Sequence, residues 1–178
     1  VGAALSLAGA QMQTILNNPL ASPFTLGISA AASFGAAMGL AFGVALFPLA
    51  AQYMVSVNAF IMAMLSALLI HFLSMRRGVT AETIVLLGIA LVFTFNALLA
   101  LVQFFATEQA VAAVVFWTMG SLTKATWPKL GVICLVILIT LPIFAKRAWA
   151  LTALRLGDDK AASFGINVRS LRFQMLIM

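Results

Sequence analysis

The amino-terminal part of this sequence has no charged side chains. Its first 75 residues include no Lys, Arg, Asp or Glu, and the first charged residue is Arg76. In ordinary globular domains about a quarter of the residues are charged, and a surface without charge is poorly solvated by water. This absence excludes a water-soluble domain and predicts that a lipid bilayer surrounds this part of the chain.

The composition of the whole chain supports the same class. Charged residues make up 8% of the sequence and apolar residues 64%, against about 25% and about 45–50% in globular domains. Apolar runs recur as far as the carboxyl-terminal end and no basic segment precedes the first of them, so a short secretory signal does not explain the pattern. Because both ends fall within apolar runs, we interpret the sequence as a fragment of a longer multi-pass membrane protein.

Residues that carry chemistry are scarce as well. Cys134 is the single cysteine, which excludes an intrachain disulfide and a cysteine metal cluster. No glycine-rich phosphate loop, Ser/His/Asp set or pair of carboxylates occurs, so we expect no enzyme, no metal and no cofactor. Glu82 and Glu108 lie at the ends of apolar runs, and His71 is expected at a helix end. Since ion-coupled transporters usually keep such groups within the membrane, energy for transport is expected to come from elsewhere.

The long apolar runs predict membrane-spanning helices, since about 20 apolar residues cross the hydrocarbon core. Complete spans are predicted at residues 24–47, 52–75, 83–106 and 128–144, and partial spans at residues 1–16 and from residue 169 onward. The predicted fold class is therefore all-α: a polytopic transmembrane helical bundle, forming a single domain over residues 1–178. The apolar run at residues 110–119 is too short to cross, and we expect it to form a helix outside the bilayer core.

Basic residues are distributed unevenly among the predicted loops, and Lys and Arg near span ends favour the cytoplasm. Most of them fall on one side of the predicted topology: Arg76, Arg77, Lys146, Arg147, Arg155, Lys160, Arg169 and Arg172. Lys124 and Lys129 lie on the other side. The net charge of +6 therefore reports orientation rather than nucleic-acid binding. This orientation also places residues 17–23 in the cytoplasm and the turn at Pro48 outside.

Small residues recur at every fourth position in the first complete span, at Gly27, Ala31, Gly35, Gly39 and Gly43. On a helix this spacing forms one face that another backbone can approach closely. We expect this face to pack within the bundle, and a contact between two subunits is the alternative.

Several polar side chains fall inside the predicted spans. They are Gln11, Gln13, Asn58, Asn96 and Gln103. Asn96 and Gln103 are candidates for lining an aqueous pathway, and hydrogen bonding between helices is the alternative for each of the five.

The segment between residues 147 and 169 differs from the apolar runs because it mixes charged and apolar residues. Gly157 or Asp158 is a suitable cap for a short helix, Asp159 favours its positive amino-terminal end, and Gly165 is suited to end it in the left-handed conformation. We predict a compact cytoplasmic element that presents a docking surface. An amphipathic helix resting on lipid headgroups is the alternative.

Several motifs, in the same order along the chain, resemble the FecCD/BtuC-like family of permease subunits from ATP-binding-cassette importers for iron-siderophores, haem and vitamin B12. The resemblance covers the whole sequence. The motifs are GAALSLAGAQMQ at residues 2–13, NNPLASP at 17–23, LGIS at 26–29, IVLLGIAL at 84–91, FWTMGSL at 116–122 with Trp127, and LGDDKAASFGINV at 156–168. Phe164 departs from the family pattern, which usually has Leu there.

The resemblance implies roles for three groups of residues. The family's coupling helices, which fit a cleft on the ATPase, correspond here to a segment at about residues 150–168 with the candidates Leu156, Gly157, Asp158, Asp159, Ala161, Ser163, Phe164 and Gly165. The cytoplasmic gate corresponds to Thr80, Ala81, Glu82 and Thr83, where the aligned Ala81-Glu82 departs from the small hydroxyl residues of related gates; Glu82 could instead pair with Arg76 or Arg77. The cytoplasmic loop motif corresponds to Asn18, Pro19, Leu20, Ala21 and Pro23.

The family also implies an architecture and partners. A full subunit would have about ten spans, of which roughly six are represented here. Two permease subunits, identical or homologous, would pair around a central pathway and work with cytoplasmic ATP-binding subunits and a periplasmic substrate-binding protein in the bacterial inner membrane. No nucleic-acid partner is expected.

The predicted function is that of a permease subunit that moves an iron(III)-siderophore, driven by a separate ATPase. Haem or vitamin B12 is the alternative cargo. Two other classes remain open: an ion-coupled secondary transporter or channel that uses Asn96 and Gln103 directly, and a membrane scaffold without transport.

Overall fold

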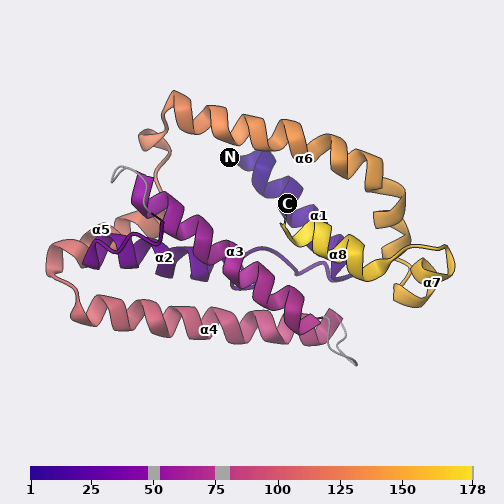
Figure 1. Ribbon diagram of the computed structural model, residues 1–178, viewed down its shortest axis with the longest axis horizontal. Coiled ribbons are helices and arrows are strands. Elements are labelled where there is room, and N and C mark those ends of the chain that lie inside the picture. Colours follow the sequence, from indigo (N-terminus) through magenta and orange to yellow (C-terminus); the bar gives the residue numbers. More distant parts are fainter. Residues whose placement is uncertain (48–52, 75–80, 178) are drawn as a thin grey trace. The chain divides into compact units, whose positions relative to one another are not determined.

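The computed structural model describes residues 1–47, 53–74 and 81–177, and regular structure in these ranges is entirely helical (Figure 1). The α-helices are α1 Gly2–Ile15, α2 Ile28–Phe42, α3 Met54–Ser74, α4 Ala81–Phe105, α5 Glu108–Met119, α6 Trp127–Leu154, α7 Asp158–Ser163 and α8 Val168–Ile177. A short 3-10 helix spans Leu122–Lys124. The all-α prediction is confirmed.

The chain divides into two compact units. One combines Val1–Ser22 with Thr123–Met178 and holds α1, α6, α7 and α8. The other is Pro23–Leu122 and holds α2 to α5. Residues distant in the sequence therefore share the first unit, whereas the second is continuous.

Three of the described helices are long and apolar enough to cross a bilayer: α3, α4 from Glu82, and α6. Helix α2 is shorter than the predicted span at residues 24–47, because Gly27 and Gly43 bound it in the left-handed conformation with φ of 75° and 65°. With 15 residues, α2 is about 22 Å long at 1.5 Å per residue. The predicted turn at Pro48 lies outside the described residues.

Helices α2 and α3 approach each other through glycine. A Cβ atom on Gly35 would collide with the backbone carbonyl oxygen of Asn58 and lie 2.7 Å from Cγ of Met62, and one on Gly39 would lie 3.1 Å from Nδ2 of Asn58. Only a residue without a side chain fits at Gly35 at this separation. The predicted small-residue face thus packs within the chain from Gly27 to Gly39, whereas Gly43 is exposed.

The side chain of Asn58, which lies in this contact, forms hydrogen bonds with the backbone that follows α2. Its fully buried side chain accepts a hydrogen bond from the amide of Leu46 at 2.9 Å and donates one to the carbonyl of Val44 at 2.6 Å. Such pairing is needed because a buried polar group without a partner costs about 1–3 kcal/mol. For Asn58, hydrogen bonding is therefore the observed role.

The turn before α2 packs against α4 at a second glycine. A Cβ atom on Gly88 would lie 2.8 Å from both Cα of Leu26 and the carbonyl oxygen of Thr25, and one on Gly27 would lie 2.9 Å from Cβ of Leu91. Further along α4, the ring of Phe95 lies 6.1 Å from that of Phe34 on α2. The residues of the LGIS and IVLLGIAL motifs are therefore neighbours.

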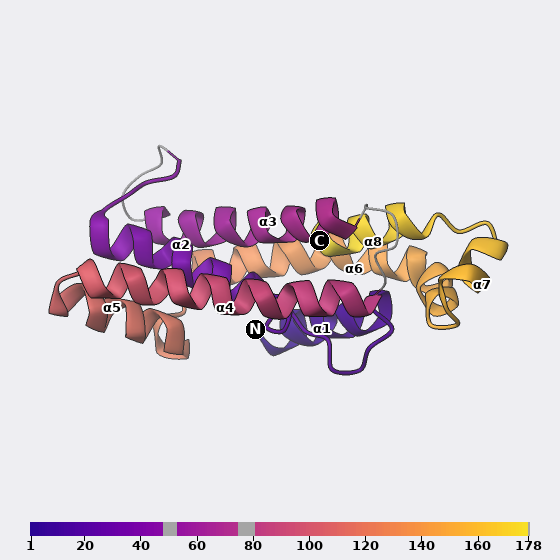
Figure 2. The ribbon, with the colours of Figure 1, turned by 90° about the horizontal axis from the view of Figure 1, so that it is seen from below.

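Helix α5 confirms the short apolar helix predicted at residues 110–119. It begins at the carboxyl-terminal end of α4 and runs back from it (Figure 2). Val114 on α5 forms a buried cluster with Ala37 on α2 and Val102 on α4. Thr107 caps the helix by accepting a hydrogen bond from the amide of Ala110.

Helix α6 is longer than the predicted span at residues 128–144, since it continues to Leu154 over 28 residues. Lys146 and Arg147, which the sequence placed in a loop, are therefore helical. Pro142 lies inside α6, where proline lacks the backbone donor for one helical hydrogen bond, and the helix bends in its second half (Figure 1).

We expect the substitution Gly35→Ala to destabilise the protein. Its methyl group would meet the backbone of Asn58, which cannot rotate away as a side chain can, and overpacking of this kind costs about 1–3 kcal/mol. Gly131→Ala on α6 is the matched control, because a Cβ there meets nothing within 4 Å. Melting temperatures of the purified full-length variants provide the measurement. Equal values for the two variants would contradict the close α2–α3 contact.

Candidate functional site

The segment predicted to couple the permease to an ATPase contains a short helix with defined ends. Gly157 precedes α7 as its N-cap with φ of 104°, so Gly157 rather than Asp158 is the cap. At the other end Gly165 is left-handed with φ of 79°. The amide of Gly165 donates to the carbonyl of Ala162 at 2.9 Å and that of Ile166 donates to Ala161 at 3.2 Å, which is a Schellman motif. The predicted role of Gly165 as helix terminator is confirmed.

Most of the candidate coupling residues lie on the surface of this element. The exposed fractions of Leu156 and Phe164 are 56% and 54%, and Asp159 and Ser163 are also exposed. Ala161 is fully buried and anchors α7. A helix of 6 residues with two exposed apolar side chains beside it therefore presents a mixed apolar and polar surface.

A hollow lies beside this surface. It has a volume of about 360 Å³ and is lined by residues of α6, the α7–α8 turn and α8. The ring centroids of Trp149 and Phe164, which border it, are 6.2 Å apart, and Lys146 and Arg147 contribute basic side chains. The hollow extends the mixed surface with aromatic and basic groups.

The cytoplasmic loop motif ends α1. Asn17 is left-handed with φ of 45°, its amide donates to the carbonyl of Thr14, and the amide of Asn18 donates to that of Gln13. This is a second Schellman motif, with Asn in the place that glycine usually takes. Asparagine suits the place because its short polar side chain tolerates the left-handed conformation.

The remaining motif residues form the turn that follows. The side chain of Asn18 accepts a hydrogen bond from the amide of Leu20 at 2.9 Å, and the Gln13 side chain donates to the carbonyl of Pro19 at 2.8 Å. Ala21 is buried and Leu20 is exposed. For Gln13, hydrogen bonding is thus the observed role. We expect Leu20 to contribute to a partner-facing surface.

Arg172 joins the α7 segment to the turn that ends α1, a role that was not predicted from the sequence. Its guanidinium donates to both carboxylate oxygens of Asp158 at 2.8 and 2.9 Å, and its Nε donates to the carbonyl of Ile15 at 2.9 Å. One side chain from α8 thus contacts the first residue of α7 and the last residue of α1. A signal for this role exists in the sequence, because Arg172 interrupts an apolar stripe formed with Val168, Leu171 and Met175 at helical spacing.

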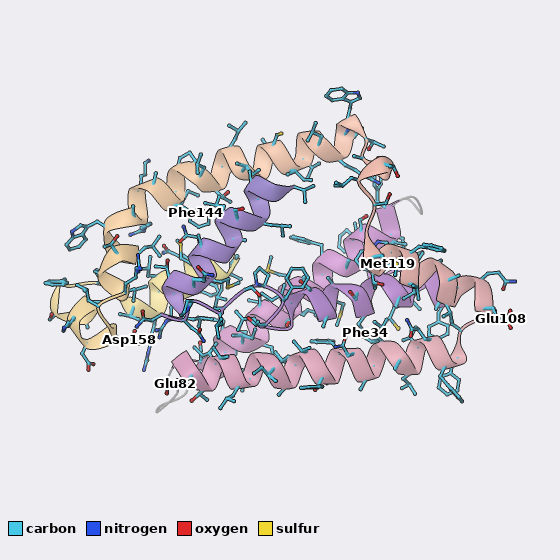
Figure 3. The ribbon with its side chains drawn as sticks, turned by 180° about the vertical axis from the view of Figure 1, so that it is seen from behind. Phe34, Glu82, Glu108, Met119, Phe144 and Asp158 are labelled. Carbon is cyan, nitrogen blue, oxygen red and sulfur yellow. The ribbon has the colours of Figure 1, made fainter. Side chains whose placement is uncertain are left out.

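The predicted gate is described in part. Thr80, Arg76 and Arg77 lie outside the described residues, so the alternative pairing of Glu82 with either arginine lies there too. Helix α4 begins at Ala81, and Glu82 lies in its first turn, at the helix end opposite to the one that leads to Glu108 (Figure 3). Glu82 and Thr83 are therefore helical, where a carboxylate interacts favourably with the helix dipole. A role in gating stays a prediction.

The candidate pathway residues share one side of α4. Asn96 and Gln103 are seven positions apart, which is about two helical turns. The buried stripe of α4 contains Ile84, Leu91 and Val102 instead. Asn96 is exposed in its unit and Gln103 is half-buried. This position is compatible with an aqueous pathway, and that role stays a prediction.

Other titratable groups form no site within the described ranges. His71 lies in the last turn of α3, as predicted, and Cys134 is an exposed free thiol. No group of three or more His, Cys, Asp or Glu residues that could hold a metal occurs among the described residues.

The motifs and helices agree with known proteins. A profile of the FecCD transport family matches residues 1–178. An ABC transporter permease of Methanocaldococcus jannaschii is 38% identical over 179 residues, covering 96% of this chain and 51% of that protein. The hemin transport system permease HmuU of Yersinia pestis is 33% identical over 178 residues, covering 100% of this chain and 53% of that protein.

A solved structure has the same fold. It is described as an inward-facing conformation of a metal-chelate type ABC transporter and matches with a TM-score of 0.85 at 28% identity, covering 99% of this chain and 55% of that one. Further relatives are named for import of molybdate, iron(3+)-hydroxamate and vitamin B12. The chain spans about half the length of the curated relatives it matches.

Fold and motifs together first define a class, that of multi-pass membrane proteins, built entirely from helices in the part described. Within that class, the chain belongs to the FecCD transport family.

We expect Gly165→Val to unravel the end of α7. A β-branched residue at φ of 79° costs about 1–3 kcal/mol, so amide hydrogen exchange at residues 161–166 of the full-length permease should accelerate. Gly165→Asn is the control, because asparagine tolerates this conformation. Slow exchange in the Val variant, equal to that of the unchanged protein, would contradict the role assigned to Gly165.

Proposed function

We propose that the protein containing this chain is the permease subunit of an ABC importer, and that α7 with its flanking turns is the element that receives force from a separate cytoplasmic ATPase. The observation that carries the proposal is the family match over residues 1–178. The geometry of α7 supports it, because a short helix held at both ends by backbone hydrogen bonds is suited to insertion into a cleft of a partner.

In this mechanism the permease catalyses no reaction. Two ATP-binding subunits would close on ATP binding and push the coupling elements of two permease subunits, identical or homologous, which opens a central cavity to one side of the membrane at a time. A substrate-binding protein would deliver the cargo from outside the cytoplasmic membrane. The gate at residues 80–83 and the side of α4 that carries Asn96 and Gln103 are the proposed elements of the pathway.

We propose an iron(III)-siderophore as the cargo. Support comes from a relative in Helicobacter pylori named for iron chelatin transport, 35% identical over 182 residues, and from the relative named for iron(3+)-hydroxamate. Haem, vitamin B12 and molybdate are the alternative cargoes, each represented by a named relative. Uptake assays with ferric catecholate, ferric hydroxamate, haem, cobalamin and molybdate in a strain lacking the full-length protein would distinguish them.

The source of energy separates the proposal from its main rival. Proteoliposomes that contain the permease and its ATPase, with the substrate-binding protein outside, should accumulate cargo only when ATP is supplied. Accumulation without the ATPase, driven by a proton or sodium gradient, would favour a secondary transporter that uses Asn96 and Gln103 directly. Absence of accumulation under either condition, with no bound ATPase, would favour a scaffold.

We expect Phe164→Ser to weaken binding of the ATPase. Burial of a phenylalanine side chain contributes about 1.5–3 kcal/mol, so loss of the exposed ring should raise the Kd for the ATPase about tenfold or more. Phe116→Ser is the matched control, because Phe116 is similarly exposed but lies on α5, on the predicted external side. Binding of the detergent-solubilised ATPase to each variant is the measurement, and equal affinities would contradict the proposed docking surface.

A further inference from the structure

The side chain of Arg172, on α8, contacts both α1 and α7. We propose that Arg172 and Asp158 form a positioning pair that transmits displacement of α7 to the end of α1, so that force applied at the docking surface reaches α1 directly. This inference rests on the proposed function of α7 as the coupling element.

The geometry of the pair is that of a rigid link. Both carboxylate oxygens of Asp158 are engaged, which fixes the orientation of the guanidinium as well as its distance. The side chain of Arg172 is 15% exposed and that of Asp158 is 51% exposed. Because the arginine is mostly shielded from water, these partners replace the hydrogen bonds to water that an exposed guanidinium would make.

The third contact explains why the link reaches α1. The Schellman motif at the end of α1 uses the carbonyls of Gln13 and Thr14. The carbonyl of Ile15, the last residue of the helix, instead accepts the Nε hydrogen of Arg172 at 2.9 Å. A cation at this end also interacts favourably with the negative pole of the helix dipole. Arg172 therefore binds α1 through one nitrogen and α7 through the other two.

Lysine cannot replace arginine in this arrangement. Its ammonium is a single point of contact, whereas the guanidinium presents donors in a planar fork. A lysine at position 172 could contact Asp158 or Ile15, but it could not hold both with the observed geometry. The requirement for a fork distinguishes a positioning role from a general need for positive charge on α8.

The chain offers a matched control for each partner. Glu108, like Asp158, is an exposed acidic first residue of a helix, and it forms no ion pair among the described residues. Arg169 lies on α8 with Arg172, is exposed and forms no ion pair within the same ranges. Glu108→Gln and Arg169→Gln thus remove one acidic and one basic charge and leave the link and the candidate coupling residues unchanged.

The test measures cargo transported per ATP hydrolysed in proteoliposomes that contain the full-length permease and its ATPase, with the substrate-binding protein supplied outside. Asp158→Asn and Arg172→Gln are expected to lower this ratio about tenfold, the scale of a lost charge-assisted hydrogen bond. Glu108→Gln and Arg169→Gln should keep it. Arg172→Lys should resemble Arg172→Gln, whereas Asp158→Glu, which retains a carboxylate, should recover part of the ratio.

A distance measurement reports the link itself. Spin labels at exposed positions 6 on α1 and 160 on α7, in a Cys134→Ser background, should give a narrow distance distribution in the parent and in Glu108→Gln. Arg172→Gln and Asp158→Asn should broaden it while the ATPase remains bound. If Arg172→Gln fails to accumulate in the membrane, Asp158→Asn decides the question, because it conserves volume at a half-exposed site.

Two outcomes would overturn the inference: a transport ratio in Asp158→Asn equal to that of Glu108→Gln, or an unchanged distance distribution in Asp158→Asn. Failure of the proposed function gives a different result. In that case the unchanged importer shows no ATP-dependent uptake and binds no ATPase, while the distance measurement still reports whether Arg172 holds α7 to α1.

Discussion

The need to satisfy backbone polar groups at helix ends underlies this structure. A chain with few polar side chains has few groups that can form hydrogen bonds with a free backbone carbonyl or amide. Backbone groups without a hydrogen-bond partner are costly in lipid. Several of the described helices end at residues that can adopt the left-handed conformation, such as Asn17, Gly43 and Gly165. The backbone carbonyl of Ile15 is not used by the turn that ends α1, and it accepts a hydrogen bond from the side chain of Arg172 on α8.

The same constraint applies to the turns after α1 and α7, which the distribution of basic residues predicts to be cytoplasmic. The turn after α1 and the turn after α7 are both Schellman motifs, and both present short, ordered backbone rather than flexible loops. Arg172 connects the end of α1 to the start of α7 through Asp158. Under the proposed mechanism, these ordered turns and this ion pair would transmit displacement of α7 to α1.

Much of this was predictable because it depends on local sequence. Apolar runs predicted the helices, glycine spacing predicted the close approach around Gly35, and Gly165 predicted the end of α7. The prediction was less accurate for lengths, since α2 ends at Gly43 and α6 continues past Phe144 to Leu154. Hydropathy averages over a window, and it neither marks a single left-handed residue nor distinguishes a loop from a helix that leaves the apolar layer.

The sequence by itself determined the membrane class of the chain, the helical fold class, the family and the position of the short helix α7, because each depends on residue type and spacing along the chain. Only the tertiary structure showed that Asn58 closes the turn after α2 and that Arg172 contacts Ile15, 157 positions away. Such contacts depend on which faces of separate helices meet, and the packing that brings them together is not encoded in any one segment.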